Sequence, residues 1–104
     1  MTELEQAKFL TYLTQNGYTD LKPIQGGVRY AGLFQFMFTW AIIIGKMGDH
    51  FTYEDRWCYH DYEKAKAGLD AWDGAAGTEP TGWHRHPITG RRVDDETGEM
   101  YVAA

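Results

Sequence analysis

Four side chains in this sequence have residue types and an alternate-residue spacing that would permit a transition-metal site. Cys58 and His60 alternate along one predicted strand, and His84 and His86 alternate along a second segment. Alternate residues of a strand share a face, so each pair would project together. One thiolate and three imidazoles can bind zinc tetrahedrally. The spacing matches no recognised ligand motif, however, and a semi-buried cysteine with surface histidines explains the same residues. We therefore expect no metal and no cofactor.

Cys58 could also act as a nucleophile with a histidine as its base. The α-carbons of alternate strand residues lie about 7 Å apart, which strains a direct hydrogen bond between Cys58 and His60. His84 is an alternative base. No orienting acid or oxyanion motif accompanies these residues. Cysteine is more commonly a small apolar core residue, so we expect a protein with no catalytic residues, which is not an enzyme.

Acidic side chains surround the same predicted strand. Asp49, Glu54, Asp55 and Asp61 could perform acid/base chemistry or hold a hard cation. They lack the ligand order of a calcium-binding loop, and solvated strand ends and a helix cap account for them. With Glu63 they belong to an acidic stretch over residues 49–73, which could form a binding face.

The basic segment that follows contrasts with this acidic stretch. Residues 78–92 read TEPTGWHRHPITGRR. Its candidate binding residues are Trp83, His84, Arg85, His86, Arg91 and Arg92. They could stack on bases and pair with phosphates, or anchor a protein interface. Alternatively, Trp83 packs this segment onto the domain and the arginines pair with the acids of residues 94–99.

Composition narrows the class of protein. The chain has 104 residues, of which 43% are hydrophobic and 15% aromatic, enough for one modest core. Its single cysteine fits a reducing compartment. The formal net charge of −5 disfavours general nucleic-acid binding. No signal-peptide pattern opens the sequence, and the longest nearly charge-free run, residues 31–45, is shorter than the roughly 20 residues of a membrane span. These features predict a cytosolic protein.

Two helices are predicted. The first runs over residues 3–16, where Thr2 and Glu5 can form a capping box and Tyr18 can pack back on Leu13 after a Schellman ending. The second runs over residues 62–72, with Asp61 as its N-cap. Its apolar residues fall on one helical face, which favours packing against a sheet.

The remaining elements are predicted strands. Residues 21–25 and 28–33 flank a Gly-Gly hairpin signal, residues 34–44 alternate as one central strand, and alternation resumes over residues 51–60. The fold class is therefore α+β in α-β-β-β-α order, an antiparallel sheet of three to four strands with both helices on one face. Residues 1–76 form the core domain. Residues 77–104 form an arm that packs on it, with a hairpin pairing residues 91–93 with residues 100–102.

Several motifs resemble a known group of proteins. They are Arg56-Trp57-Cys58-Tyr59, Ala71-Trp72-Asp73-Gly74, the run Glu79 to Pro87 (EPTGWHRHP), and Thr89-Gly90-Arg91-Arg92. Over roughly residues 20–93 the chain resembles small uncharacterised accessory proteins of tailed phages and prophages of proteobacteria. The resemblance implies no assigned chemistry. It implies a genomic context in which small acidic proteins often inhibit host machinery, as anti-CRISPR and other anti-defence proteins do.

The sequence thus favours a phage accessory protein that inhibits a host or defence complex by protein contact, in the host cytoplasm. Asp55, Asp61 and Glu63 would occlude a basic nucleic-acid groove, and the arm would anchor specificity. Alternatives are a nucleic-acid-binding module that uses residues 83–92, a virion structural component, and a metal-dependent enzyme at the cysteine and histidines. The αβββα order is shared with double-stranded-RNA-binding domains, but their last helix begins with basic residues and this one begins with Asp61.

Overall fold

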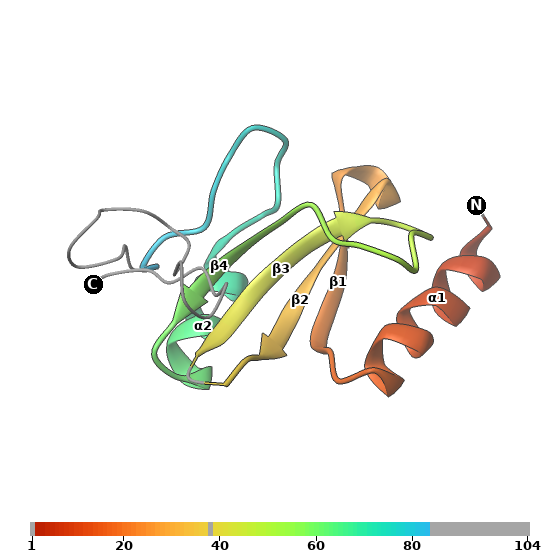
Figure 1. The fold of residues 1–104 in the computed structure, drawn as a ribbon. Coiled ribbons are helices and arrows are strands. Elements are labelled where there is room, and N and C mark those ends of the chain that lie inside the picture. The colour runs from red at the N-terminus through yellow and green to blue at the C-terminus, as the bar shows by residue number, and fades with distance from the viewer. Residues whose placement is uncertain (1, 38, 84–104) are drawn as a thin grey trace.

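Over the described residues, the fold is an α+β arrangement of two helices around a four-stranded antiparallel sheet, as the sequence predicts (Figure 1). The computed structural model describes residues 2–37 and 39–83. The elements are α1 (Glu3–Gln15), β1 (Thr19–Ile24), the 3-10 turn η1 (Gln25–Gly27), β2 (Arg29–Gln35), β3 (Trp40–Lys46), β4 (Asp55–Tyr59) and α2 (Tyr62–Ala71). The strands lie side by side in sequence order.

Local side-chain signals set the ends of both helices, and these predictions are confirmed. The Thr2 hydroxyl accepts from the Glu5 amide, and the Glu5 carboxylate accepts from the Thr2 amide. After α1, the Tyr18 amide donates to the Leu13 carbonyl, which is the long bond of a Schellman ending. At α2, the Asp61 carboxylate accepts from the Lys64 amide at 2.8 Å. Each cap satisfies backbone groups that the helix itself leaves unpaired.

The prediction of one central strand over residues 34–44 is wrong, because the chain reverses inside it. β2 ends at Gln35, β3 begins at Trp40, and the Phe36 amide donates to the Thr39 carbonyl across the turn. Gln35 pairs with Trp40 and Phe34 pairs with Ala41. Directly paired residues share a face, so the turn places Phe34 with Ala41 rather than with Trp40.

The helices cover opposite faces of the sheet, so the prediction that both lie on one face is also wrong. Trp40, Ile42 and Ile44 pack in the cluster that contains Leu69 of α2. Ala41 and Ile43 pack in the cluster that contains Phe9 and Leu13 of α1. Because neighbouring strand residues point to opposite faces, the sheet lies between two separate cores. A strand with two apolar faces is typical of a sheet covered on both sides.

The chain after α2 is fastened to the sheet by polar contacts. Lys22 of β1 donates to the carbonyls of Leu69 and Trp72 at 2.7 and 2.6 Å, at the end of α2. Farther on, Pro80 is buried, and the Tyr59 hydroxyl donates to the Thr81 carbonyl at 2.7 Å. Residues 72–83 therefore follow a path set by β1 and β4. The hairpin predicted over residues 91–102 lies outside the described residues.

Candidate functional site

The predicted cysteine and histidine candidates do not form a metal site within the described residues. Cys58 has no exposed surface and packs in the α1-face cluster with Tyr30 and Ile43. His60 is exposed just beyond the end of β4. Across residues 2–37 and 39–83, no three His, Cys, Asp or Glu side chains could hold a metal ion together. The other two candidates, His84 and His86, lie outside this range.

The three predicted acidic binding residues fall at two ends of β4. Asp55 begins the strand, whereas Asp61 and Glu63 follow it as the cap and first turn of α2. A strand rises about 3.3 Å per residue, which puts roughly 13 Å between Asp55 and the last strand residue. Asp61 also has a structural role, because its carboxylate caps α2. The acids therefore border a long surface rather than form one cluster.

Trp83 is half-buried and packs against both core clusters. This contact agrees with the interpretation in which Trp83 attaches the following segment to the domain. The other arm residues predicted to bind, Arg85, Arg91 and Arg92, lie outside the described residues, as do the two histidines. Their role stays a prediction.

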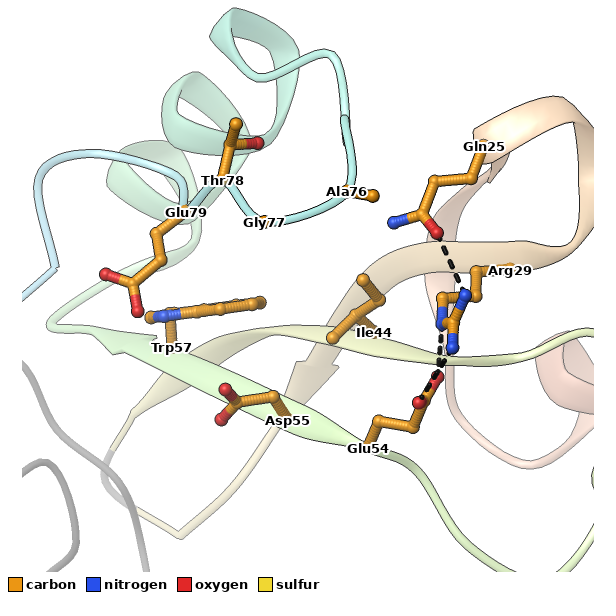
Figure 2. A pocket seen from close by; sticks show the side chains of 10 residues that line it. All are labelled: Gln25, Arg29, Ile44, Glu54, Asp55, Trp57, Ala76, Gly77, Thr78 and Glu79. Atoms are coloured by element: carbon orange, nitrogen blue, oxygen red, sulfur yellow. Dashed lines mark hydrogen bonds and ion pairs between the residues drawn. The ribbon is translucent and has the colours of Figure 1, made fainter.

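A hollow of about 420 Å³ opens between β4, the β1–β2 turn and the loop after α2. We call it the Trp57 pocket. Figure 2 shows its lining: Gln25, Arg29, Ile44, Glu54, Asp55, Trp57, Ala76, Gly77, Thr78 and Glu79. Arg29 lies between Gln25 and Glu54 at one end of the view, and Trp57, Asp55 and Glu79 lie at the other. Apolar and acidic side chains thus share the hollow.

Among the described residues that line the pocket, Arg29 carries the one guanidinium, and it is already engaged in the wall. Arg29 donates from Nε to Oε1 of Glu54 at 2.6 Å, from Nη2 to Oε2 at 3.2 Å, and from Nη1 to Oε1 of Gln25 at 3.0 Å. These hydrogen bonds hold the pKa of Glu54 below its ordinary value and raise the pKa of Arg29. Arg29 therefore offsets the charge of Glu54 within this wall.

Hydrogen bonds also fix the loop that forms the other wall. The Trp72 indole donates to the Thr78 hydroxyl at 2.9 Å, which in turn donates to the Ala75 carbonyl at 2.6 Å. Nε2 of the Gln25 side chain donates to the Gly74 carbonyl at 3.0 Å and joins the two walls. Gly74 has a φ of +76°, and an added Cβ would lie 2.5 Å from Ile24 Cγ2. Only glycine fits this close approach without strain.

A second hollow, of about 220 Å³, opens between α1 and the β3–β4 loop. We call it the Phe51 groove. It is lined by Tyr12, Leu13, Asn16, Tyr18, Tyr30, Asp49, His50, Phe51, Thr52 and Tyr53. Phe51 is 95% exposed, and Tyr12 and Tyr53 are 38% and 37% exposed. His50 contacts both Phe9 and Tyr12 edge-on, with ring centroids 5.0 and 4.7 Å apart. Burial raises the pKa of Tyr18 and of Tyr30, so both phenols stay neutral at physiological pH.

The sequence indicates Asp49, Glu54 and Asp55 as candidates but not most of the other residues of the two hollows. The alternating pattern predicts that Phe51 lies in a strand, where its side chain would point to one face of the sheet. The turn glycine at position 48 and the Asx turn in which the Phe51 amide donates to Asp49 place it in a loop instead. The short polar interruption of residues 48–50 was the available signal. Arg29 and Glu79 carried none, because their neighbours in space are distant in sequence.

Comparison with protein-family models, with curated proteins and with solved structures gave no match. Within the described residues, neither helix has the length and apolar character needed to cross a bilayer. The two hollows and their side chains are therefore the basis for the functional proposal.

Proposed function

We propose that this protein is a binding protein of the phage accessory type, which inhibits a host or defence complex in the host cytoplasm by protein contact, as anti-CRISPR proteins do. The observation that carries the proposal is the exposure of aromatic side chains around the Phe51 groove. Phe51, Tyr12 and Tyr53 converge there from a loop and a helix. Aromatic residues around a hollow are typical anchors of protein interfaces.

The acidic side chains support a basic partner surface. Asp49 lies in the Phe51 groove, and Glu54 and Asp55 line the neighbouring Trp57 pocket. Several nearby cations are engaged within the molecule: Lys22 binds α2 carbonyls, Arg29 binds Glu54, and Lys66 binds Asp70. Arg56 is buried with its guanidinium 4.4 Å from the ring centre of Phe36. A surface of this charge is complementary to the basic grooves that bind nucleic acid, and steers association with them.

The position of Trp83 bears on the alternative of nucleic-acid binding. A stacking platform needs an open aromatic face. Trp83 packs instead against core residues on both sides of the sheet. We therefore assign residues 83–92 a supporting role in protein contact, in which Trp83 is not a base-stacking residue.

The first experiment measures inhibition directly. The full chain is expressed in a proteobacterial host with active CRISPR interference, and the plating efficiency of a targeted phage is measured. We expect plating to recover, and affinity purification at physiological salt to recover components of the interference complex. No recovery of plating across the host's defence systems, together with no partner, would refute the proposal.

The structure offers a matched pair of variants for this assay. Phe51→Ala removes an anchor that is 95% exposed, so folding should be unaffected while inhibition and capture are lost. Met37→Ala is the control, because Met37 is 79% exposed at the β2–β3 turn, at the other end of the sheet from the groove. If the two variants lose inhibition equally, the Phe51 groove is not the contact.

A further inference from the structure

The lining of the Phe51 groove points to a specific occupant: we propose that it receives a lysine side chain of the partner protein. This inference rests on the proposed function, because it assumes a protein partner with a basic surface. It adds the residue type that the groove recognises and the groups that recognise it. The groove lies between α1 and the β3–β4 loop, which extends past the sheet towards α1 (Figure 1).

The charge of the lining favours a cation. Among the described residues that line the groove, Asp49 carries the one carboxylate, and none is a lysine or an arginine. Arg29 and Lys46 act instead on Glu54, outside the lining, and lower its pKa, with the hydrogen bond from Arg29 as the main cause. Burial is the main cause that raises the pKa of Tyr30 inside the groove, and Asp49 adds to it. The negative charge of Asp49 is therefore felt within the groove, where it would attract a cation.

The polar groups of the lining fit an ammonium better than a guanidinium. Oδ1 of Asp49 already accepts from the Phe51 amide at 2.9 Å, which holds the carboxylate in the loop. A guanidinium binds most strongly when both carboxylate oxygens meet its planar fork, whereas an ammonium is a point charge with three rotatable donors. Nδ2 of Asn16 donates to the Tyr12 carbonyl at 2.7 Å, so the amide oxygen is the group that Asn16 can offer as a further acceptor.

Aromatic rings supply a second attraction for the same cation. Tyr12, Phe51 and Tyr53 line the groove and are exposed. The face of such a ring attracts a cation that lies within about 6 Å of the ring centre. The four-carbon stem of a lysine can lie along these rings and along Leu13, while its charged end remains in contact with water. One carboxylate and several rings thus match the two parts of a lysine side chain.

The groove has the size of a single side chain and is held in place before binding. Its volume of about 220 Å³ is below the roughly 300–1,000 Å³ that is usual for pockets of small-molecule ligands. Backbone bonds anchor both ends of the loop: the Met47 amide donates to the Val28 carbonyl at 3.0 Å, and the Glu54 amide donates to the Ile44 carbonyl at 2.8 Å. Little ordering is then needed on binding, which preserves the free energy of the new contacts.

The test uses the isolated full chain, so it does not depend on finding the partner. Nα-acetyl-lysine methylamide is titrated into isotope-labelled protein, and NMR shifts are followed. We expect saturable shifts centred on the amides of Asp49 and Phe51 and on the Tyr53 ring, with a Kd on the order of 1–10 mM for a single side chain. Absence of saturable shifts with this probe would overturn the inference.

Two related probes separate charge from shape. The Nε-acetylated form of the lysine probe keeps the stem but carries no charge, and it should not bind. Nα-acetyl-arginine methylamide has the same charge on a planar head, and it should bind more weakly than the lysine probe. Equal binding of the charged and acetylated lysine probes would overturn the inference, and so would an arginine probe that binds as tightly as the lysine probe.

Variants locate the binding. Asp49→Asn should weaken the lysine probe about tenfold, as expected for one lost charge-assisted bond, while asparagine can still accept from the Phe51 amide. Asp73→Asn is the matched control, because the Asp73 carboxylate accepts from the Ala75 amide in the same way, at 3.0 Å, in the loop after α2. Tyr53→Leu removes a ring but keeps an apolar side chain, and should weaken the probe about threefold. Unchanged affinity in Asp49→Asn or Tyr53→Leu, or an equal loss in Asp73→Asn, would refute the assignment.

The two proposals fail separately. A protein that binds the lysine probe but neither inhibits defence nor captures a partner would refute the proposed function and leave the assignment of the groove intact. A protein that inhibits and loses inhibition in Phe51→Ala, but ignores the lysine probe, would refute only the lysine assignment.

Discussion

Lys22→Met tests whether one lysine holds the end of α2 and, through it, a wall of the Trp57 pocket. The last turn of α2 contains no basic residue. The cation that compensates its carbonyls comes instead from β1, where Lys22 Nζ donates to Leu69 and Trp72 at 2.7 and 2.6 Å. A helix C-terminus favours positive charge, so this contact combines two hydrogen bonds with a dipole interaction. Methionine retains most of the stem and removes the charge.

The magnitude follows from the number of bonds and their exposure. A hydrogen bond to a charged group contributes about 1.5–3 kcal/mol. Lys22 is half-buried, so water replaces part of what the substitution removes. We therefore expect the free energy of unfolding to fall by about 2 kcal/mol in total, rather than by the sum of two buried bonds. For a domain near 100 residues, that corresponds to a Tm lower by roughly 8–16 °C.

Urea unfolding followed by circular dichroism measures the change, and the NMR signal of the Trp72 indole reports on the adjoining loop. Lys8→Met on exposed α1 is the matched control and should change stability by less than about 0.5 kcal/mol. If Lys22→Met unfolds with the same free energy as Lys8→Met, then the contact does not stabilise the end of α2. A stability loss without a change at Trp72 would mean that the lysine acts on β1 alone.

Three further predictions concern other parts of the domain. Gly74→Ala should lower the free energy of unfolding in urea by about 2–4 kcal/mol, because it adds a clash with Ile24 to the strain at positive φ. Gly77→Ala is the control, at a similar φ but with open space around it, and should cost about 1 kcal/mol. Equal costs for the two variants would contradict the packing argument. The hydrogen bond from Arg29 lowers the pKa of Glu54 in the folded state, so the pair stabilises the fold above the unfolded pKa and loses this contribution as pH falls through the folded pKa. Between pH 7 and pH 3, the free energy of unfolding of Glu54→Gln should therefore fall less than that of the unsubstituted protein, by up to about 1 kcal/mol. Cys58, with no exposed surface, should react with a thiol reagent only as fast as the domain opens, and rapid reaction of the native protein would exclude the buried position.

The helices could be predicted from the sequence because their signals are local. The Thr2–Glu5 capping box and the Asp61 cap each involve residues three positions apart, and both are present in the structure. No tertiary contact is needed to recognise them. The same holds for the turn after β3, where the Asp49 amide donates to the Lys46 carbonyl.

The prediction of one strand over residues 34–44 is wrong because the alternation of apolar residues does not reveal a chain reversal. Large apolar residues continue at every second position through the turn, so the pattern has no break where the chain changes direction. The reversal also places Phe34 on the other face of the sheet from Trp40, so the wrong strand and the wrong face for Phe34 have the same cause. Since both faces of β3 are apolar, hydrophobic content could not reveal that α1 and α2 cover different faces.

The candidate sites depend on contacts that no sequence pattern records. Arg29 and Glu54 are 25 residues apart and meet only after β2, β3 and β4 have paired. The Trp57 pocket further needs the loop after α2 to lie over the sheet, which depends on Gln25 and Lys22. Glu54 and Asp55 could be named from their charge alone, but the other residues that line the pocket could not.

The two-sided burial of β3 has a consequence for how the strand finds its place. Ile42 and Ile43 are adjacent and both fully buried. A shift of the strand by one residue would therefore exchange one apolar face for the other, with little loss of hydrophobic burial. Side-chain volume must then discriminate between alignments. Gly45 pairs with Tyr30, whose hydroxyl would lie 2.5 Å from any Cβ at that position. A one-residue slip would bring Ile44 or Lys46 against that phenol, and the side chain would clash with it. The absence of a Cβ at Gly45 therefore disfavours the misaligned sheet.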